Sequence, residues 1–216
     1  MRLVLALLLL AAIAAPSASA ARFAVTLTGD LRASWREHVT YVDGGCTFTT
    51  DDVGGSSTLA FTGKRSTVVS VTRSRGFRVR GSSLATLTGP LWRTTASGTA
   101  TSQACGRSIH WDAGPPTQRP FAGAVSLKRP GRGQLALAFV QRPDAAAWGP
   151  PEIGTAAIPP LDRAVGRVDQ RRFFDRRVKR IVVRAQYGDD LPIVGDISGS
   201  VRRGVDWKLI FRRLGR

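Results

Sequence analysis

The apolar and polar residues after position 20 alternate over short stretches, which is the pattern of half-buried β-strands. The first stretch runs from Arg22 to Gly29, where Phe23, Val25 and Leu27 alternate with Ala and Thr. The last stretch runs from Val205 to Leu214. Its two faces carry different residues, namely Val205, Trp207, Leu209 and Phe211 on one and Asp206, Lys208 and Arg212 on the other. The sequence therefore predicts strands at both ends of this region.

Further β-rich runs lie between clusters of Gly, Pro or Ser. Residues 33–41 are expected to form the hairpin partner of the first strand, and residues 193–201 the partner of the last. Turns are expected at 43–45, 52–55 and 187–191. The other expected strands are residues 58–62, 67–73, 77–80, 84–88, 91–101, 121–127, 135–141 and 181–186.

Two segments depart from this pattern. Residues 142–160 contain five prolines, which a central strand does not tolerate, so an ordered loop is expected there. Residues 162–172 are compatible with a short helix capped by Asp162, although Gly166 weakens it. The whole pattern predicts one all-β domain over residues 21–216, an antiparallel β-sandwich or barrel of about ten strands with at most one short helix.

The first 20 residues have the features of a secretory signal peptide. Arg2 precedes an unbroken apolar run from Leu3 to Ala15, Pro16 follows, and Ala18-Ser19-Ala20 supplies small residues at the cleavage site. The run is shorter than the roughly 20 residues that span a membrane. The sequence predicts cleavage after Ala20 and a soluble, secreted protein, extracellular or held in the cell envelope, that does not span the membrane.

The chain has two cysteines, Cys46 and Cys105. Outside the cytoplasm an isolated pair usually forms a disulfide, and this one would close a loop of 60 residues. Zinc binding is less favoured because zinc takes four ligands and only His38 and His110 are available as histidine partners. We therefore predict a Cys46–Cys105 disulfide.

The charge is strongly one-sided. There are 32 basic and 15 acidic residues, and 28 of the basic residues are Arg. Nine basic residues lie between Arg163 and Arg184, opposed only by Asp169 and Asp175. Further basic residues lie at Arg73, Arg75, Arg78 and Arg80 and at Arg202, Arg203, Lys208, Arg212, Arg213 and Arg216.

If these residues share a face, their field attracts polyanions, and Arg suits phosphate and carboxylate groups. The predicted partners are anionic cell-wall polymers or lipid surfaces, with nucleic acid bound only without sequence recognition. The predicted site is Arg171, Arg172, Arg176, Arg177, Lys179 and Arg180. The alternative is a GC-rich genome that spreads arginines over a neutral surface.

Residues for catalysis or metal binding are scarce. Glu37 and His38 are neighbours in an expected strand, so their side chains point to opposite faces. His110 with Asp112 supplies half of a hydrolase triad, but no Gly-x-Ser-x-Gly elbow is present. Calcium at the acidic turns is less favoured than solvated carboxylates, because Asp43, Asp51-Asp52 and Asp189-Asp190 lack EF-hand spacing. We expect no cofactor and no catalytic residue, with a hydrolase centred on His110 kept as an alternative.

The five tryptophans suggest an alternative hypothesis, because a small barrel or sandwich rich in aromatic residues can enclose an apolar ligand. The protein would then be a carrier of an apolar small molecule. Lipocalins pair an N-terminal Trp with a basic C-terminal strand, but Arg32-Ala33-Ser34 before Trp35 lacks their Gly-x-Trp signature. Three features together resemble uncharacterised secreted β-rich proteins of high-GC Gram-positive bacteria. They are the leader, the start Phe23-Ala24-Val25-Thr26-Leu27-Thr28-Gly29 with Trp35 after it, and the end Val205-Asp206-Trp207-Lys208-Leu209-Ile210-Phe211. That resemblance implies a compartment and a fold type, and no activity. We expect a secreted, non-enzymatic β protein that binds anionic envelope polymers through arginines.

Overall fold

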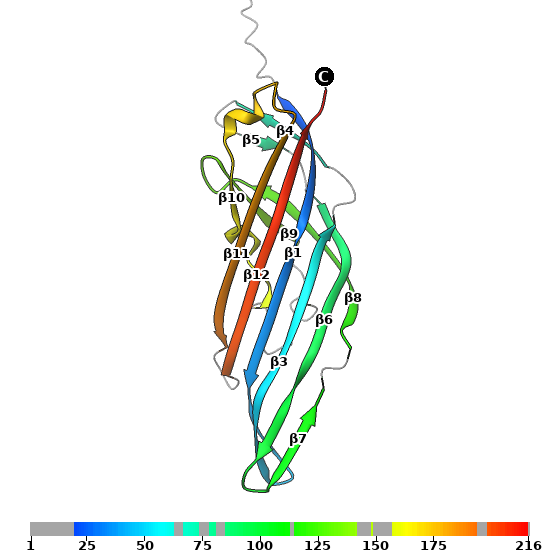
Figure 1. The fold of residues 1–216 in the computed structure, drawn as a ribbon, viewed down its shortest axis with the longest axis vertical. Helices are drawn as coiled ribbons and strands as arrows, with labels where there is room; N and C mark the ends of the chain where they lie inside the picture. The colour runs from blue at the N-terminus through cyan, green and yellow to red at the C-terminus, as the bar shows by residue number, and fades with distance from the viewer. Residues whose placement is uncertain are drawn as a thin grey trace, which may run out of the picture.

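The computed structural model describes residues 20–62, 67–73, 78–80, 85–112, 115–141, 148, 157–193 and 198–215. The strands in this part of the chain join one antiparallel sheet of 12 strands, which confirms the predicted all-β class (Figure 1). The strands are β1 (Ala21–His38), β2 (Thr40–Asp43), β3 (Cys46–Thr62), β4 (Thr67–Thr72), β5 (Arg78–Arg80), β6 (Ala85–Ser102), β7 (Arg107–Trp111), β8 (Thr117–Lys128), β9 (Gln134–Gln141), β10 (Val165–Arg167), β11 (Arg180–Ile193) and β12 (Ser198–Arg213).

The long strands lie side by side along the long axis of an elongated molecule (Figure 1). The main path of the sheet is β10-β9-β8-β6-β3-β1-β12-β11. The first strand of that path lies against the last, since a Cβ added at Gly166 of β10 would be 2.6 Å from Val183 Cγ1 of β11. The sheet therefore curls and encloses a core between its two halves. Among the described residues, no helix is long and apolar enough to cross a membrane.

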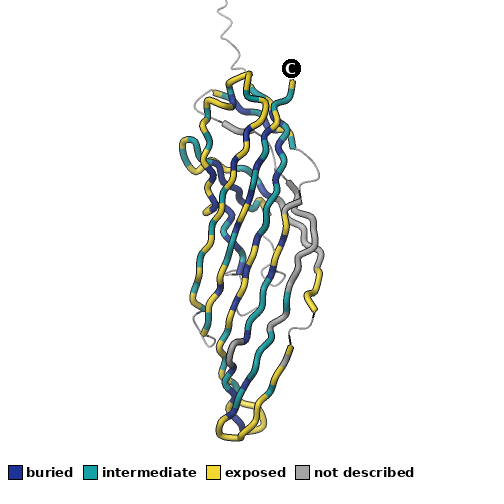
Figure 2. The backbone as a smooth tube through the Cα atoms, viewed as in Figure 1, coloured by how far each residue is buried: buried dark blue, intermediate teal, exposed yellow. Residues whose placement is uncertain are grey.

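The core lies on the inner face of the curled sheet. Alternate residues of the long strands are buried and exposed, as Figure 2 shows for β1, β12 and β11. The face predicted for the last strand is confirmed, because Val205, Trp207, Leu209 and Phe211 are buried while Asp206 and Arg212 are exposed.

β1 is one strand, so the hairpin expected between residues 22–29 and 33–41 is wrong. It pairs with β12 without interruption from Phe23 to His38. Leu27 and Leu31 are buried and keep the period of two on either side of the half-buried Gly29. A Cβ at Gly29 would lie 2.1 Å from the carbonyl oxygen of Asp206. The glycine permits close contact with β12, with φ of 145°, and does not turn the chain.

The turn expected at 52–55 is also wrong, because these residues lie inside β3. Pairing between β3 and β6 shifts register between Asp51 and Gly54 and again between Gly54 and Ser56. A Cβ at Gly55 would lie 2.5 Å from the indole ring of Trp35, and a Cβ at Gly54 would lie 2.8 Å from the Trp35 carbonyl oxygen. The two glycines therefore make room for Trp35 within an irregular strand.

One end of the molecule is a narrow tip. The turn predicted at 43–45 is confirmed as a two-residue hairpin loop, in which Gly44 and Gly45 have φ of 55° and 78° and Asp43 pairs with Cys46. The predicted disulfide is confirmed too, with 6.0 Å between the Cα atoms of Cys46 and Cys105. It ties the start of β3 to the turn between β6 and β7. A small separate cluster of Cys46, Phe48 and Ala100 packs inside this tip.

Three other boundaries differ from the sequence prediction. Residues 85–88 and 91–101, expected as parts of two strands, belong to one strand, β6, while residue 84 lies outside the described residues. The turn expected at 187–191 lies inside β11, and the final hairpin therefore joins β11 to β12, with Ile193 opposite Gly199. In place of the helix at 162–172 there are two 3-10 turns around β10, namely Leu161–Arg163 (η2) and Gln170–Phe173 (η3). Gly166 in the middle pairs with Leu135 of β9, so this segment is held by the sheet.

Most of the predicted proline-rich loop, apart from Trp148 and residues 157–160, lies outside the described residues, and so do residues 1–19 of the predicted leader. Trp148 itself is fully buried in the main core. The hydroxyl of Ser57 on β3 donates a hydrogen bond of 2.6 Å to its carbonyl oxygen. The described part of this segment therefore contributes a residue to the core.

Candidate functional site

Basic segments that are distant in sequence meet at the end of the molecule opposite the disulfide tip. This end contains η3 and the turn after it, the start of β11, the end of β12, and β4 with β5 (Figure 1). The Arg73 guanidinium, just after β4, lies 4.5 Å from the centre of the Phe174 ring. Arg180 of β11 is directly opposite Arg212 of β12. We call this end the basic end and define its basic residues as Arg22, Arg73, Arg171, Arg172, Arg176, Arg177, Lys179, Arg180 and Arg212.

A buried aromatic cluster anchors η3 to the sheet. Phe173 is fully buried and forms edge-to-face contacts with Phe23 and Phe211, at 5.4 Å and 5.1 Å between ring centres. The next residue, Phe174, is only partly buried beneath Arg73. Both rings therefore have packing roles, while the arginines of the segment are exposed.

Arg213 fixes the turn that follows η3. Its guanidinium donates hydrogen bonds to the carbonyl oxygens of Phe173 (2.7 Å), Asp175 (3.0 Å) and Val178 (3.1 Å). It also lies 4.9 Å from the centre of the Phe23 ring. Arg213 is one of the basic residues near the C-terminus, but its guanidinium holds the basic segment in place.

We expect Arg213→Gln to lower the free energy of unfolding by about 1.5–3 kcal/mol, because the shorter side chain leaves carbonyl oxygens without their charged donor. Hydrogen exchange should quicken at residues 171–179. The control is Arg212→Gln, which removes an exposed charge facing Arg180 and should leave stability unchanged or slightly raised. Equal losses of stability in the two variants, measured by urea unfolding, would contradict the anchoring role.

The six residues predicted as the binding site are all exposed at the basic end. Within the described residues, none of them forms an ion pair with a carboxylate. The two acidic residues in the segment bond to backbone, since Asp169 Oδ1 accepts from the Arg171 N–H at 3.0 Å and Asp175 Oδ1 accepts from the Arg177 N–H at 2.9 Å. The structure thus brings the predicted residues together with their charges accessible.

The outer face beside the basic end has like charges placed opposite one another. Arg180 faces Arg212 in the register of β11 and β12, and Arg184 faces Lys208 four pairs further along, on the same face. Directly opposed like charges destabilise a sheet. An anion bound between them would remove that repulsion.

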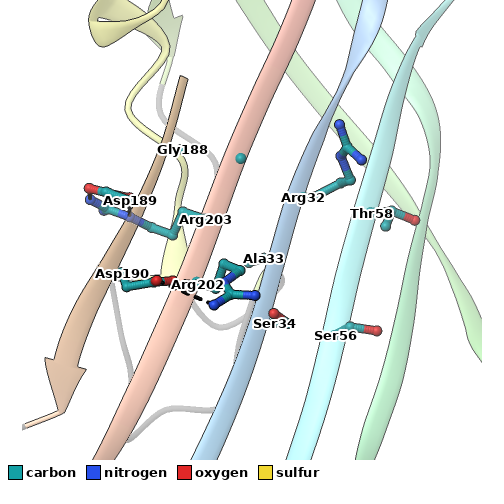
Figure 3. A pocket seen from close by; sticks show the side chains of 11 residues that line it. Arg32, Ala33, Ser34, Ser56, Thr58, Gly188, Asp189, Asp190, Arg202 and Arg203 are labelled. Carbon is teal, nitrogen blue, oxygen red and sulfur yellow. Dashed lines mark hydrogen bonds and ion pairs between the residues drawn. The ribbon is translucent and has the colours of Figure 1, made fainter. Parts of the chain in front are cut away.

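Arg202 and Arg203 do not belong to this surface. They lie in the first half of β12, opposite Asp190 and Asp189 of β11. Figure 3 shows both pairs beside a groove of about 440 Å³ on the sheet, where Gly188 faces Gly204. Arg202 Nε bonds to Asp190 Oδ1 at 2.9 Å on the outer face. The expected grouping of these two arginines with the C-terminal cations is therefore wrong, because the register supplies each with a carboxylate.

The Arg203–Asp189 pair is largely buried. Arg203 Nε donates to Asp189 Oδ1 at 2.9 Å, a second guanidinium nitrogen bonds to Oδ2, and Tyr187 donates to Oδ2 at 3.2 Å. These donors, led by Arg203, hold the pKa of Asp189 below its usual value although burial acts against them. Arg203 also donates to the Ile158 carbonyl oxygen at 3.2 Å and so ties residues 157–160 to the sheet. The expected acidic turn at Asp189-Asp190 is thus a pair of strand residues facing opposite sides.

His110 lies on the exposed surface of the tip. Its Nδ1 is 3.0 Å from Thr99 Oγ1 and its Nε2 is 3.2 Å from Asp112 Oδ1, so a hydroxyl, an imidazole and a carboxylate follow one another. The side chains of His110 and Asp112 are 65% and 87% exposed, so water competes for both. His38 is exposed at the end of β1, and Glu37 beside it points to the other face. His38 is on β1 and His110 is on β7, so β3 and β6 lie between them in the sheet.

The tryptophans whose side chains are described are core residues. Trp35, Trp148 and Trp207 are all buried. Trp207 Nε1 donates a hydrogen bond of 3.1 Å to the Ala164 carbonyl oxygen. These rings fill the space between the halves of the sheet, which gives no support to an apolar ligand among them.

The basic end is the arrangement with the clearest chemical capacity. It offers exposed guanidinium groups that form no ion pair with a carboxylate of the described part of the chain, and Phe173 and Arg213 fix the segment that carries most of them. Arg22, which the sequence reasoning missed, joins them because β1 begins there, and no local signal in the sequence marks it. No protein-family model matches the chain, and no curated protein is similar to it in sequence.

Proposed function

We propose that this is a secreted, non-enzymatic protein that binds anionic polymers of the cell envelope at the basic end. The observation that carries the proposal is the convergence of exposed cations from four parts of the chain, with the local carboxylates used as backbone caps. An even scatter of arginines, as in the GC-rich alternative, would place carboxylates among them, as happens at Arg202 and Arg203. The predicted leader and the disulfide agree with a partner outside the cytoplasm.

The polymer is expected to bind mainly through its charge. Arginine suits phosphate and carboxylate groups because its planar fork donates two parallel hydrogen bonds. Both binding partners release counterions when they meet, so affinity falls as salt rises. Phe173 is buried and Phe174 is covered by Arg73, so the aromatic pair is not available to insert into a bilayer. These features favour a wall polymer over a lipid surface.

The test is a four-residue variant in which Arg171, Arg172, Arg176 and Arg177 become Gln. We expect co-sedimentation with purified cell walls to weaken at least about tenfold at physiological salt, and the slope of log affinity against log salt to flatten by about 2 to 3 units. The control variant changes four exposed arginines elsewhere, Arg32, Arg107, Arg163 and Arg202, and so has the same net charge. Equal weakening in both variants would mean that only net charge matters, and the site would be abandoned.

A further inference from the structure

A second concave feature lies beside the basic end, between the turn joining β8 to β9 and the residues that lead into η3. It is a pocket of about 400 Å³ lined by Arg132, Gly133, Gln134, Arg167, Val168 and Asp169. This volume is within the range of small-molecule pockets, about 300–1,000 Å³. No pattern in the sequence connects residues 129–134 with residues 167–169, so the position of Arg132 beside Arg167 follows only from the fold.

Backbone contacts fix the walls of this pocket. Arg167 of β10 is directly opposite Gln134 of β9, so their side chains leave the sheet on the same face. The N–H of Val168 donates to the Gly133 carbonyl oxygen at 2.8 Å, and the N–H of Gln134 donates to the Gly131 carbonyl oxygen at 3.2 Å. Gly133 has φ of 69°, a conformation that favours glycine. The turn that carries Arg132 is therefore held against β10.

The polar groups of the pocket suit an oxyanion. Arg132 and Arg167 contribute two guanidinium groups, and the Gln134 carboxamide contributes a further donor. Within the described residues, neither arginine forms an ion pair. Asp169 is the one acidic residue of the lining, and its Oδ1 accepts the Arg171 N–H at 3.0 Å. Two positive charges against one negative charge leave the site cationic.

We propose that this pocket binds a single phosphate group of an envelope phosphate polymer, while the rest of the polymer runs over the basic end. Two guanidinium forks and an amide offer more donors than one carboxylate can accept, and a phosphate group with its larger set of oxygens matches them. The Asp169 carboxylate keeps acceptor capacity for a hydroxyl group next to the phosphate, as in an alditol phosphate. The polymer part of this inference rests on the proposed function, but the phosphate pocket does not.

The experiment compares variants of the mature protein in two assays. The first is titration calorimetry with inorganic phosphate, and the second is binding of poly(glycerol phosphate) and of polygalacturonate, which carries carboxylates. We expect the Arg132→Gln/Arg167→Gln variant to lose at least tenfold in affinity for inorganic phosphate and for poly(glycerol phosphate), with polygalacturonate binding unchanged. Thermal unfolding checks that the variant keeps its fold. We expect it to do so, because both arginine side chains are exposed and not part of the core.

Two further variants separate this inference from the proposed function. The four-residue variant of Arg171, Arg172, Arg176 and Arg177 should keep its affinity for inorganic phosphate and lose affinity for both polymers. Asp169→Asn keeps the Oδ1 acceptor for the Arg171 N–H but removes a negative charge, so phosphate should bind several-fold more tightly. If the wild-type protein binds no phosphate, or if the Arg132/Arg167 variant binds it as well as the wild type, the pocket assignment is overturned even where the basic end still binds polymer.

Discussion

Replacing both cysteines by serine should lower the free energy of unfolding by about 4 kcal/mol, the value that loop-closure entropy assigns to a disulfide of this span. Cys46 and Cys105 are 59 positions apart, so the reduced chain gains much freedom when it unfolds. The bond also lies at the narrow tip, where the separate cluster of Cys46, Phe48 and Ala100 is small and cannot easily compensate. The tip is the part of the sheet that should loosen first.

Urea unfolding of the wild type and of the Cys46→Ser/Cys105→Ser variant measures this difference directly. The wild type with its disulfide reduced serves as the matched control and should unfold like the variant. Hydrogen exchange should increase in β2 and β7 while β11 and β12 stay protected. A loss below about 1 kcal/mol, with unchanged exchange at the tip, would show that the bond constrains the unfolded chain far less than its span implies.

Phe173→Ala should produce a loss of similar size at the opposite end, about 3–5 kcal/mol, which is usual when a buried Phe is truncated in a core. The ring contacts Phe23 and Phe211 and is fully buried, so its removal leaves a cavity beneath η3. Because η3 carries Arg171 and Arg172, this variant should also weaken polymer binding although every charge is retained.

The control is Phe174→Ala, which removes a neighbouring, partly buried ring and should cost clearly less stability. Urea unfolding and cell-wall co-sedimentation measured on the same samples connect the two effects. If Phe173→Ala destabilised the protein yet bound walls with wild-type affinity at a temperature where it is folded, a fixed position of η3 would not matter for binding.

Much of the fold follows from local pattern. The alternation of apolar residues identifies most strands, because one face of each is buried and the other is exposed. The pairing of Cys46 with Cys105 follows because no other cysteine exists. The double glycine at 44–45 makes a turn, since both residues adopt positive φ there. These features depend on neighbours along the chain, and the sequence contains that information.

Other glycines that resemble turn residues lie inside strands, for a physical reason. Gly29, Gly54 and Gly55 look like turn residues, but each lies where another strand or the Trp35 ring comes too close for a Cβ. Gly188 likewise lies within β11, opposite Gly204 of β12. Whether a glycine serves a turn or a close contact depends on what packs against it, and the sequence does not show that.

Some features of the candidate site can also be predicted from local sequence, and others depend on the fold. The fold class, the disulfide and the strongly basic run of residues 163–184 can be predicted from the order of residues. Which cations remain available depends on the fold: strand register gives Arg202 and Arg203 carboxylate partners, while Arg213 holds the turn after η3. The fold also brings Arg22 and Arg73 to the basic end and Arg132 to Arg167. The reason is that charge is a property of each residue, whereas its pairing depends on contacts between segments far apart in the chain.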